Sequence, residues 1–434
     1  MRLCQRNQYL VDRSTLAMLV AVSLVGTASV ANAVNFTQTD KLTASNAAAG
    51  DVFGNSVAIS GNLGLVGAPF DDRGVGKSNA GSVYVFDTTT GSQLLNLAAS
   101  DGSGNDHFGW SVGLSGDYAI VGALDDDDNG DISGSAYLFN ASTGSQLFKL
   151  TASDGAAGDE FGISVGISGN RAIVGADLND DAGSASGSAY LYDVATGNQI
   201  IKLTASDADA GDQFGRAVAI SGNIAIVGAQ YNDDAGTRSG SAYLFNVNTG
   251  SELFKLVASD ATAEDEFGMS VGISGDTAIV GAGGAAYLFD VTTGAQIAKL
   301  TTGDVSANGR FGQTVAISGN IAMVGARTDD AQANLSGSAF LFEVNTGTQF
   351  AKLTALDAAA GDQFGYSVAI SGSTALIGAA FDDDAGSSSG SAYVFAAPVP
   401  TPAALPAGLA ITGIIWCRRR YKRRAHRQTS NISA

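Results

Sequence analysis

The dipeptide Phe-Gly recurs seven times at a nearly constant spacing. Its phenylalanines are Phe53, Phe108, Phe161, Phe214, Phe267, Phe311 and Phe364, and successive copies lie 55, 53, 53, 53, 44 and 53 residues apart. A fixed period of this length indicates a repeat architecture. Most units contain four short strand-like runs, each bounded by glycine, serine, asparagine or aspartate. Four antiparallel strands form one propeller blade, so the sequence predicts an all-β, seven-bladed β-propeller over residues 34–397.

The two ends of the repeat region are offset in a way that predicts how the ring closes. The last unit stops after its third run, Gly390 to Phe395. The missing fourth run has its match at the other end, in FTQTDKLTAS at residues 36–45. We therefore expect an N-terminal strand to complete the last blade, which leaves no open sheet edge.

Glycine and phenylalanine at the repeated positions are predicted to be architectural. We expect each Phe of Phe-Gly to pack in the core. Its Gly, and the Gly of Val-Gly-Ala, suit positions where the backbones of neighbouring blades approach closely. Clear copies of the second glycine are Gly67, Gly122, Gly175 and Gly228.

The units resemble FG-GAP repeats, the blades of integrin-type β-propellers, over nearly all of residues 36–395. The resemblance rests on Phe-Gly, on the Ser-Val that follows it in most units, and on Val-Gly-Ala-Pro, intact from Val66 to Pro69. It implies a recognition or adhesion platform. In that family a calcium loop usually joins the first and second strands. Here tight turns such as Ser60-Gly61-Asn62 stand at that place, so those calcium sites are not expected.

The N-terminal segment has the layout of a secretory signal peptide. Arg2, Arg6 and Arg13 precede an apolar run from Leu16 to Val25, and small residues follow up to Ala31-Asn32-Ala33. We predict cleavage after Ala33. A membrane anchor is the alternative, but the apolar run is much shorter than the roughly 20 residues that span a bilayer.

The C-terminal segment, residues 398–434, resembles a PEP-CTERM sorting signal of Gram-negative bacteria. Pro400 and Pro402 precede a short hydrophobic stretch from Ala403 to Cys417, which a basic cluster ends. That cluster is Arg418, Arg419, Arg420, Lys422, Arg423 and Arg424. The resemblance implies a transient membrane anchor, removal by an exosortase-like enzyme and display at the cell surface. A plain C-terminal anchor is the alternative.

Charge restricts the partners of the repeat region. Residues 34–397 contain 13 lysines and arginines against 41 aspartates and glutamates, a net charge of −28. Nucleic acids and anionic membrane surfaces are bound through positive charge and are therefore not expected partners. Both cysteines, Cys4 and Cys417, lie in the end segments, so no disulfide is expected within the repeat region.

Most of the acidic residues are predicted to lie on one face of the propeller. The loops between second and third strands and the loops between blades share that face, and they hold 33 of the 41 carboxylates. One hypothesis is a solvated, aggregation-resistant surface. The other is calcium binding, because hard cations relieve carboxylate repulsion. The candidate ligands are Asp125, Asp127, Asn129 and Asp131, which have EF-hand-like spacing but lack the closing Glu, since Ala136 stands there.

Two classes of function remain open from the sequence. The first is an exported binding or structural propeller that contacts an extracellular glycan or protein, with a calcium-dependent adhesion module as a variant. The second is a polysaccharide hydrolase or lyase, which would need a distinctive pair of carboxylates in a pocket. The acids recur from blade to blade, and the single histidine of the repeat region, His107, replaces Glu or Gln of most other units. We therefore favour a function without catalysis.

Overall fold

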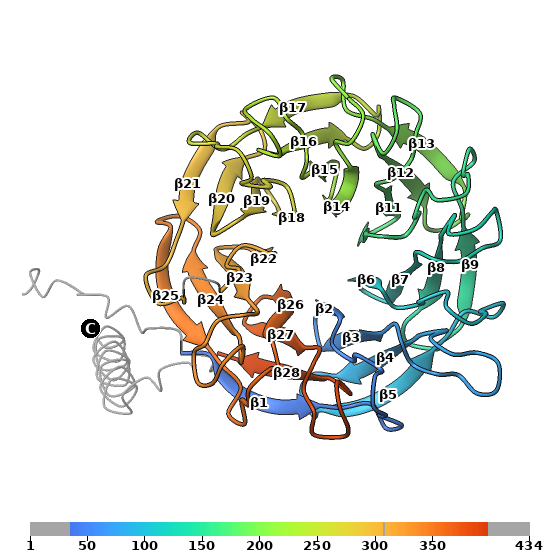
Figure 1. The fold of residues 1–434 in the computed structure, drawn as a ribbon, viewed down its shortest axis with the longest axis vertical. Helices are drawn as coiled ribbons and strands as arrows, with labels where there is room; N and C mark the ends of the chain where they lie inside the picture. Colours follow the sequence, from blue (N-terminus) through green and yellow to red (C-terminus); the bar gives the residue numbers. More distant parts are fainter. Residues whose placement is uncertain (1–34, 307–308, 398–434) are drawn as a thin grey trace, which may run out of the picture. The chain divides into compact units, whose positions relative to one another are not determined.

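The computed structural model describes residues 35–306 and 309–397. These residues form seven four-stranded antiparallel sheets arranged as the blades of a ring (Figure 1). The predicted all-β, seven-bladed propeller is confirmed. Within the described residues the regular elements are strands, and no helix there is long and apolar enough to cross a membrane.

The blades share one strand order from the axis outwards. The innermost strands are β2 (Ser56–Ser60), β6 (Ser111–Ser115), β10 (Val165–Ser168), β14 (Phe214–Ser221), β18 (Ser270–Ser274), β22 (Thr314–Ser318) and β26 (Phe364–Ser371). The second strands are β3 (Leu63–Ala68), β7 (Tyr118–Ala123), β11 (Arg171–Ala176), β15 (Ile224–Ala229), β19 (Thr277–Ala282), β23 (Ile321–Ala326) and β27 (Thr374–Ala379). The third strands are β4 (Ser82–Asp87), β8 (Ser135–Asn140), β12 (Ser188–Asp193), β16 (Ser241–Asn246), β20 (Ala285–Asp290), β24 (Ser338–Glu343) and β28 (Ser391–Ala396). The outermost strands are β5 (Ser92–Leu97), β9 (Gln146–Leu150), β13 (Gln199–Leu203), β17 (Glu252–Leu256), β21 (Gln296–Leu300), β25 (Thr348–Leu353) and β1 (Thr37–Leu42).

The core lies between the blades, because both faces of the middle strands are covered. In β8, Tyr137 and Phe139 pack in the cluster shared with the blade before, while Ala136 and Leu138 pack in the cluster shared with the blade after. Phe108 of Phe-Gly completes the first cluster with edge-on contacts to the two aromatic rings, at 5.5 and 5.7 Å between centroids. The predicted core role of the repeated phenylalanine is confirmed.

The repeated glycines lie where neighbouring blades meet. A Cβ added to Gly67 would come within 2.1 Å of the carbonyl oxygen of Gly109, and the same contact at Gly122 would be 2.0 Å from Gly162. Neither position tolerates a side chain without a backbone shift, as the sequence predicted. The serine after Phe-Gly strengthens the same junction, since Ser111 Oγ donates a hydrogen bond to the carbonyl of Gly162 at 2.8 Å.

The N-terminal strand closes the ring. Strand β1 pairs antiparallel with β28, with Lys41 opposite Tyr393 and Leu42 opposite Ala392. Leu42 is fully buried in the cluster between the last blade and the first. The predicted closure is therefore confirmed. Blade five is shorter because only Gly283 and Gly284 connect β19 to β20.

Several predictions concern segments outside the described residues. These are the signal peptide with cleavage at Ala33, and the sorting signal with Pro400, Pro402, Arg418, Arg419 and Arg420. They stay predictions.

Loss of β1 should destabilise the whole ring. We expect a chain that lacks residues 34–46 to melt lower than the full chain by roughly 5 °C or more, because Leu42 and the ladder to β28 are lost together. Thermal unfolding followed by circular dichroism measures the difference, and a chain that lacks only residues 1–33 is the control. Equal melting temperatures for the two truncated chains would show that the ring does not depend on this strand.

Candidate functional site

The two faces of the propeller differ in their connections. On one face, each first strand joins the second by a two-residue turn; in blade one, for example, β2 ends at Ser60 and β3 begins at Leu63. The predicted tight turn there is confirmed. Longer loops occupy the opposite face, which we call the loop face, and connect second to third strands and each blade to the next.

Lysines from the outermost strands neutralise acids on the loop face. Lys149 Nζ hydrogen-bonds to Asp101 at 2.9 Å, to Asp126 at 3.0 Å and also to Asp128. The ammonium lies 5.2 Å from the ring centroid of Tyr137. Burial opposes the charge of Lys149, but the three hydrogen bonds outweigh burial, so the pKa of this lysine is raised. The group is a fixed internal cation among the carboxylates.

The same arrangement recurs in six blades. In each, a lysine lies over an aromatic ring of the third strand at 5.2 to 5.4 Å and contacts the loop that precedes the blade. The lysines are Lys41, Lys149, Lys202, Lys255, Lys299 and Lys352. These six lysines therefore pair part of the negative charge predicted for this face within the protein.

The run FDDDAGSSSG shows how consecutive aspartates take different structural roles. Asp382 is buried and accepts hydrogen bonds from Tyr393 Oη at 2.8 Å and Lys41 Nζ at 2.9 Å. Asp383 accepts the backbone N–H of Ser388 at 2.7 Å and so fixes its own loop. Asp384 pairs with Lys41 at 2.5 Å. All three carboxylates have partners inside the blade.

The predicted calcium ligands do not converge on one point. Asp125 Oδ2 lies 2.5 Å from His107 Nδ1, whereas Asp127 Oδ1 accepts the backbone N–H of Ile132 at 2.8 Å. Asn129 and Asp131 follow in the same loop and form no carboxylate cluster with them. Asp125 and Asp127 thus have separate partners, and calcium binding by the four residues stays an untested prediction.

The structure brings other carboxylates together. In the part of the chain that it describes, one set of three potential ligand groups lies within 4.8 Å of one another, namely Asp357, Asp382 and Asp384. Lys41 Nζ contacts all three of these carboxylates. The place that a metal cation would take is therefore filled by the lysine ammonium.

Blade one carries its cation on the loop instead of on the outermost strand. Asn96 occupies the place of the lysine, and Arg73 occupies the place that Asp128 has in blade two. Arg73 Nη1 donates to Ser82 Oγ at 3.1 Å, to the carbonyl of Leu97 at 3.3 Å and to Asn96 Oδ1 at 3.4 Å. The cation has moved from the strand to the loop. A cation is thus kept at this place in blade one, hydrogen-bonded to neutral oxygen atoms of the same blade.

Residues that flank Phe-Gly behave differently, because their side chains differ from blade to blade. We call these residues the axial mouth, since they surround the axis at the loop face. Those after Phe-Gly are all different: Asn55, Trp110, Ile163, Arg216, Met269, Gln313 and Tyr366. Those before it are Val52, His107, Glu160, Gln213, Glu266, Arg310 and Gln363, all with φ between 50° and 57°. One backbone conformation thus presents five kinds of side chain before Phe-Gly, because Glu and Gln each occur twice there.

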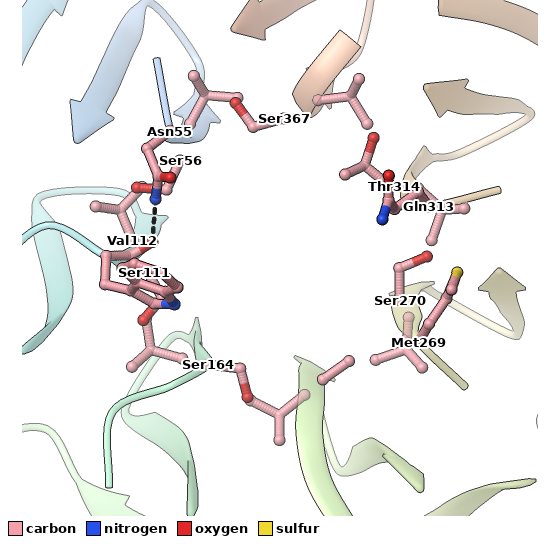
Figure 2. Close-up of a pocket in the computed structure, with 18 of the residues that line it drawn as sticks. Asn55, Ser56, Ser111, Val112, Ser164, Met269, Ser270, Gln313, Thr314 and Ser367 are labelled. Carbon is pink, nitrogen blue, oxygen red and sulfur yellow. Dashed lines mark hydrogen bonds between the residues drawn. The ribbon is translucent and has the colours of Figure 1, made fainter. Parts of the chain in front are cut away.

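The axial mouth opens into a channel of about 350 Å³ along the axis. Figure 2 shows serines of the innermost strands around the channel, with Asn55, Met269 and Gln313 beside them. Asn55 Nδ2 donates to the backbone carbonyl of Trp110 at 2.9 Å (Figure 2). Gln313 Oε1 is a buried acceptor without a hydrogen-bond partner among the described residues.

Two aromatic groups support the mouth. Phe70 contacts the rings of His107 and Trp110, with centroid distances of 4.7 and 6.5 Å. Tyr366 contacts Phe381 at 5.7 Å, and the guanidinium of Arg327 lies 4.8 Å from its ring centroid. Each of the two aromatic rings that line the channel is therefore packed against other side chains.

Arg216 and the carboxylates near it form a charged group at the mouth. Asp177 is 1% exposed; its Oδ2 is 3.5 Å from Arg216 Nη1, and its Oδ1 has no partner among the described residues. Burial raises the pKa of Glu160 to about 7, and the negative charge of Asp177 adds to this effect while Arg216 opposes it. A carboxyl group that titrates near neutral pH is thus placed at the mouth.

The sequence prediction missed the axial mouth and the lysine pairs. A signal for the mouth was present, because aligning the seven units shows a different residue after each Phe-Gly. The lysines could also be aligned, but their partners lie in another part of the sequence; Lys149 and Asp101, for example, are 48 residues apart.

The exchanged charges of blade one can be tested with a double-mutant cycle. We expect Asn96→Lys alone to lower the free energy of unfolding, because the new ammonium lies beside Arg73. Adding Arg73→Asp should restore the pairing of the other blades, with a coupling energy of about 1 kcal/mol or more. Urea unfolding of the two single variants and the double variant measures this energy. If the two substitutions change the free energy of unfolding additively, the two side chains do not interact, and this would contradict the proposed exchange of the cation between strand and loop.

Stability should depend on the ionisation of Glu160. Its raised pKa means that the stability it contributes is present below its unfolded pKa and is lost as pH rises through about 7. Glu160→Gln should therefore raise the melting temperature at pH 8 and leave it nearly unchanged at pH 4.5. Substitution of the exposed Glu264 by Gln is the control. A gain of equal size at both pH values would show that ionisation is not the cause.

The repeats match a known family. The FG-GAP repeat family matches residues 36–86, 92–139, 145–192, 198–245, 251–289, 295–342 and 348–395. Each matched segment starts with the outermost strand of one blade and ends with the third strand of the next, so the sequence repeat is offset by one strand from the blade. A comparison with curated proteins found no match. Since the matched segments cover more than half of the sequence, the chain belongs to the FG-GAP repeat family.

Proposed function

We propose that the protein is an exported binding module, without catalytic activity, that holds an extracellular glycan or protein at its axial mouth. The observation that carries this proposal is the difference among the seven residues after Phe-Gly, which share one backbone position in the blades. Seven identical groups would present a symmetric surface. A specific ligand of lower symmetry requires different groups at equivalent places, and the mouth supplies them.

The acidic loops support this choice indirectly. Their carboxylates pair with lysines, tyrosines and backbone amides, so they stabilise the blades rather than remain free for a partner. The same pairing gives no support to a calcium-dependent adhesion module. The mouth combines aromatic rings, amides and an arginine around a channel, which is the usual composition of a ligand site.

The proposed location follows from the two end segments of the sequence. A signal peptide cut after Ala33 would export the chain of a Gram-negative bacterium, and the C-terminal segment would hold it in the membrane until an exosortase-like enzyme processes it. The propeller would then be displayed at the cell surface or in the extracellular matrix.

Binding to envelope material of the producing bacterium tests the proposal. The full chain is compared with a mouth variant, which combines Trp110→Ala and Tyr366→Ala. It is also compared with a turn-face variant, which combines Asn62→Ala and Asn223→Ala in the two-residue turns of the face opposite the loop face. We expect the mouth variant to bind about tenfold more weakly or worse, and the turn-face variant to bind within about twofold of the unmodified chain. Circular dichroism checks that both variants fold.

The reverse result would contradict the proposal. If the turn-face variant loses binding and the mouth variant retains it, the ligand binds the opposite face. Release of soluble sugars from the envelope material by the full chain, but not by a Glu160→Gln variant, would instead show a catalytic function.

A further inference from the structure

The chemistry of the channel restricts the class of ligand, given that the axial mouth is the binding site proposed above. Among the described residues that line the channel, none is Asp, Glu or Lys. The one charged side chain there, Arg216, already faces the buried carboxylate of Asp177. An ionic ligand would lose its hydration in the channel without gaining an unpaired opposite charge. The lining therefore suits an uncharged ligand.

Two aromatic residues, Trp110 and Tyr366, line the channel. Tyr366 lies in β26, Asn55 directly precedes β2 and Trp110 directly precedes β6, so the three residues come from consecutive blades seven, one and two. Phe381 and Arg327 hold the ring of Tyr366, and Phe70 and His107 contact Trp110. Rings supported in this way are ordered before a ligand arrives, which lowers the entropy cost of binding.

Hydrogen-bonding groups lie between and beside these platforms. Asn55 sits between the two aromatic residues, and Gln313 precedes Tyr366 in the order of blades. Gln313 Oε1 has no partner among the described residues, so it lacks an intramolecular donor. The neighbouring serines are committed to the blade junctions; Ser367 Oγ, for example, donates to the carbonyl of Gly54 at 2.8 Å. Asn55 Nδ2 donates one N–H to the Trp110 carbonyl, so the groups left to select a ligand are the amide of Gln313 and the remaining amide atoms of Asn55.

An uncharged sugar unit matches this combination. A pyranose ring has a face rich in C–H groups that packs on an aromatic ring, and hydroxyls at its edge that bond to amides. A channel of about 350 Å³ is at the small end of ligand pockets, so it suits the end of a glycan better than the middle of a long chain. The net charge of −28 on residues 34–397 also repels polyanions.

We propose that the axial channel binds the terminal units of an uncharged glycan. The sugar faces would pack against Trp110 and Tyr366, and the hydroxyls would bond to the amides of Asn55 and Gln313. Acidic polysaccharides are excluded from the same place by the charge of the propeller.

Tryptophan fluorescence gives a direct test. The chain has two tryptophans, Trp110 and Trp416, so the full chain with Trp416→Phe reports on the mouth alone. The probes are cellotriose, maltotriose, galactotriose and N,N′,N″-triacetylchitotriose, with trigalacturonate and the peptide trilysine for comparison. We expect at least one neutral trisaccharide to shift the emission of Trp110 to shorter wavelength in a saturable way, and the two charged probes to leave it unchanged.

Two further variants link the signal to the channel. Tyr366→Ala and Gln313→Ala should each raise the Kd of the active trisaccharide by about tenfold or more. Tyr231→Ala is the matched control, because Tyr231 is an aromatic residue of the loop face, stacked with Arg238, that does not line the channel. Its Kd should stay within about twofold of the parent value.

The outcomes separate this inference from the proposed function. Failure of all four neutral trisaccharides overturns the glycan inference, and so does tighter binding of trigalacturonate or trilysine; a loss of that binding in Tyr366→Ala would still support the axial mouth. A neutral trisaccharide that binds by calorimetry, with no change in Trp110 emission and no effect of Tyr366→Ala, overturns both.

Discussion

Every blade is held against the next by a backbone contact that only glycine permits. The Gly of Phe-Gly in one blade lies over the Gly of Val-Gly-Ala in the blade before, and a Cβ on Gly122 would come within 2.0 Å of the carbonyl oxygen of Gly162. This distance is far below any non-bonded carbon–oxygen contact, so the second strand of one blade approaches the start of the next blade only where side chains are absent. The adjacent serine hydroxyl and the buried phenylalanine complete the junction. These demands explain why the same few residues recur in every unit.

The carboxylates of the loop face must be paired for the fold to be stable, because there are so many of them. Buried or clustered carboxylates destabilise a fold unless cations or hydrogen-bond donors satisfy them. Here the outermost strand sends one lysine back over an aromatic ring to reach carboxylates from two loops, as Lys149 does with Asp101 and Asp126. In blade one the cation is Arg73, which donates to Ser82 Oγ and Asn96 Oδ1. The charge pattern of this face is therefore mainly a property of the fold.

The sequence predicted the features that repeat or that follow from local chemistry. The Phe-Gly period predicted the blades, the offset of FTQTDKLTAS predicted the closing strand, and Ser60-Gly61-Asn62 predicted a tight turn. It could not predict contacts that depend on distance in space. Asp125 and Asp127 have metal-ligand spacing along the chain, yet their side chains have different partners, His107 and the backbone of Ile132. Only the three-dimensional arrangement separates such roles.

Constraints on the junctions and loops leave the axial mouth comparatively free. The residues before Phe-Gly share one backbone conformation, and all the residues after it except Ile163 line the channel. Variation there can serve a ligand without disturbing the ring. The repeated residues thus build the propeller, and the differing residues are those that we propose give it specificity.

Thermal unfolding of one combined variant tests whether the repeated residues, and not the differing residues, stabilise the propeller. Trp110, Met269, Gln313 and Tyr366 are all replaced by Asn, the residue that blade one already has at this position, and the variant is compared with Gly122→Ala. The account predicts that the fourfold variant melts within about 3 °C of the unmodified chain, while Gly122→Ala melts roughly 5 °C lower or more. A fourfold variant that melts as low as Gly122→Ala would show that the mouth residues serve the fold, and would contradict the account.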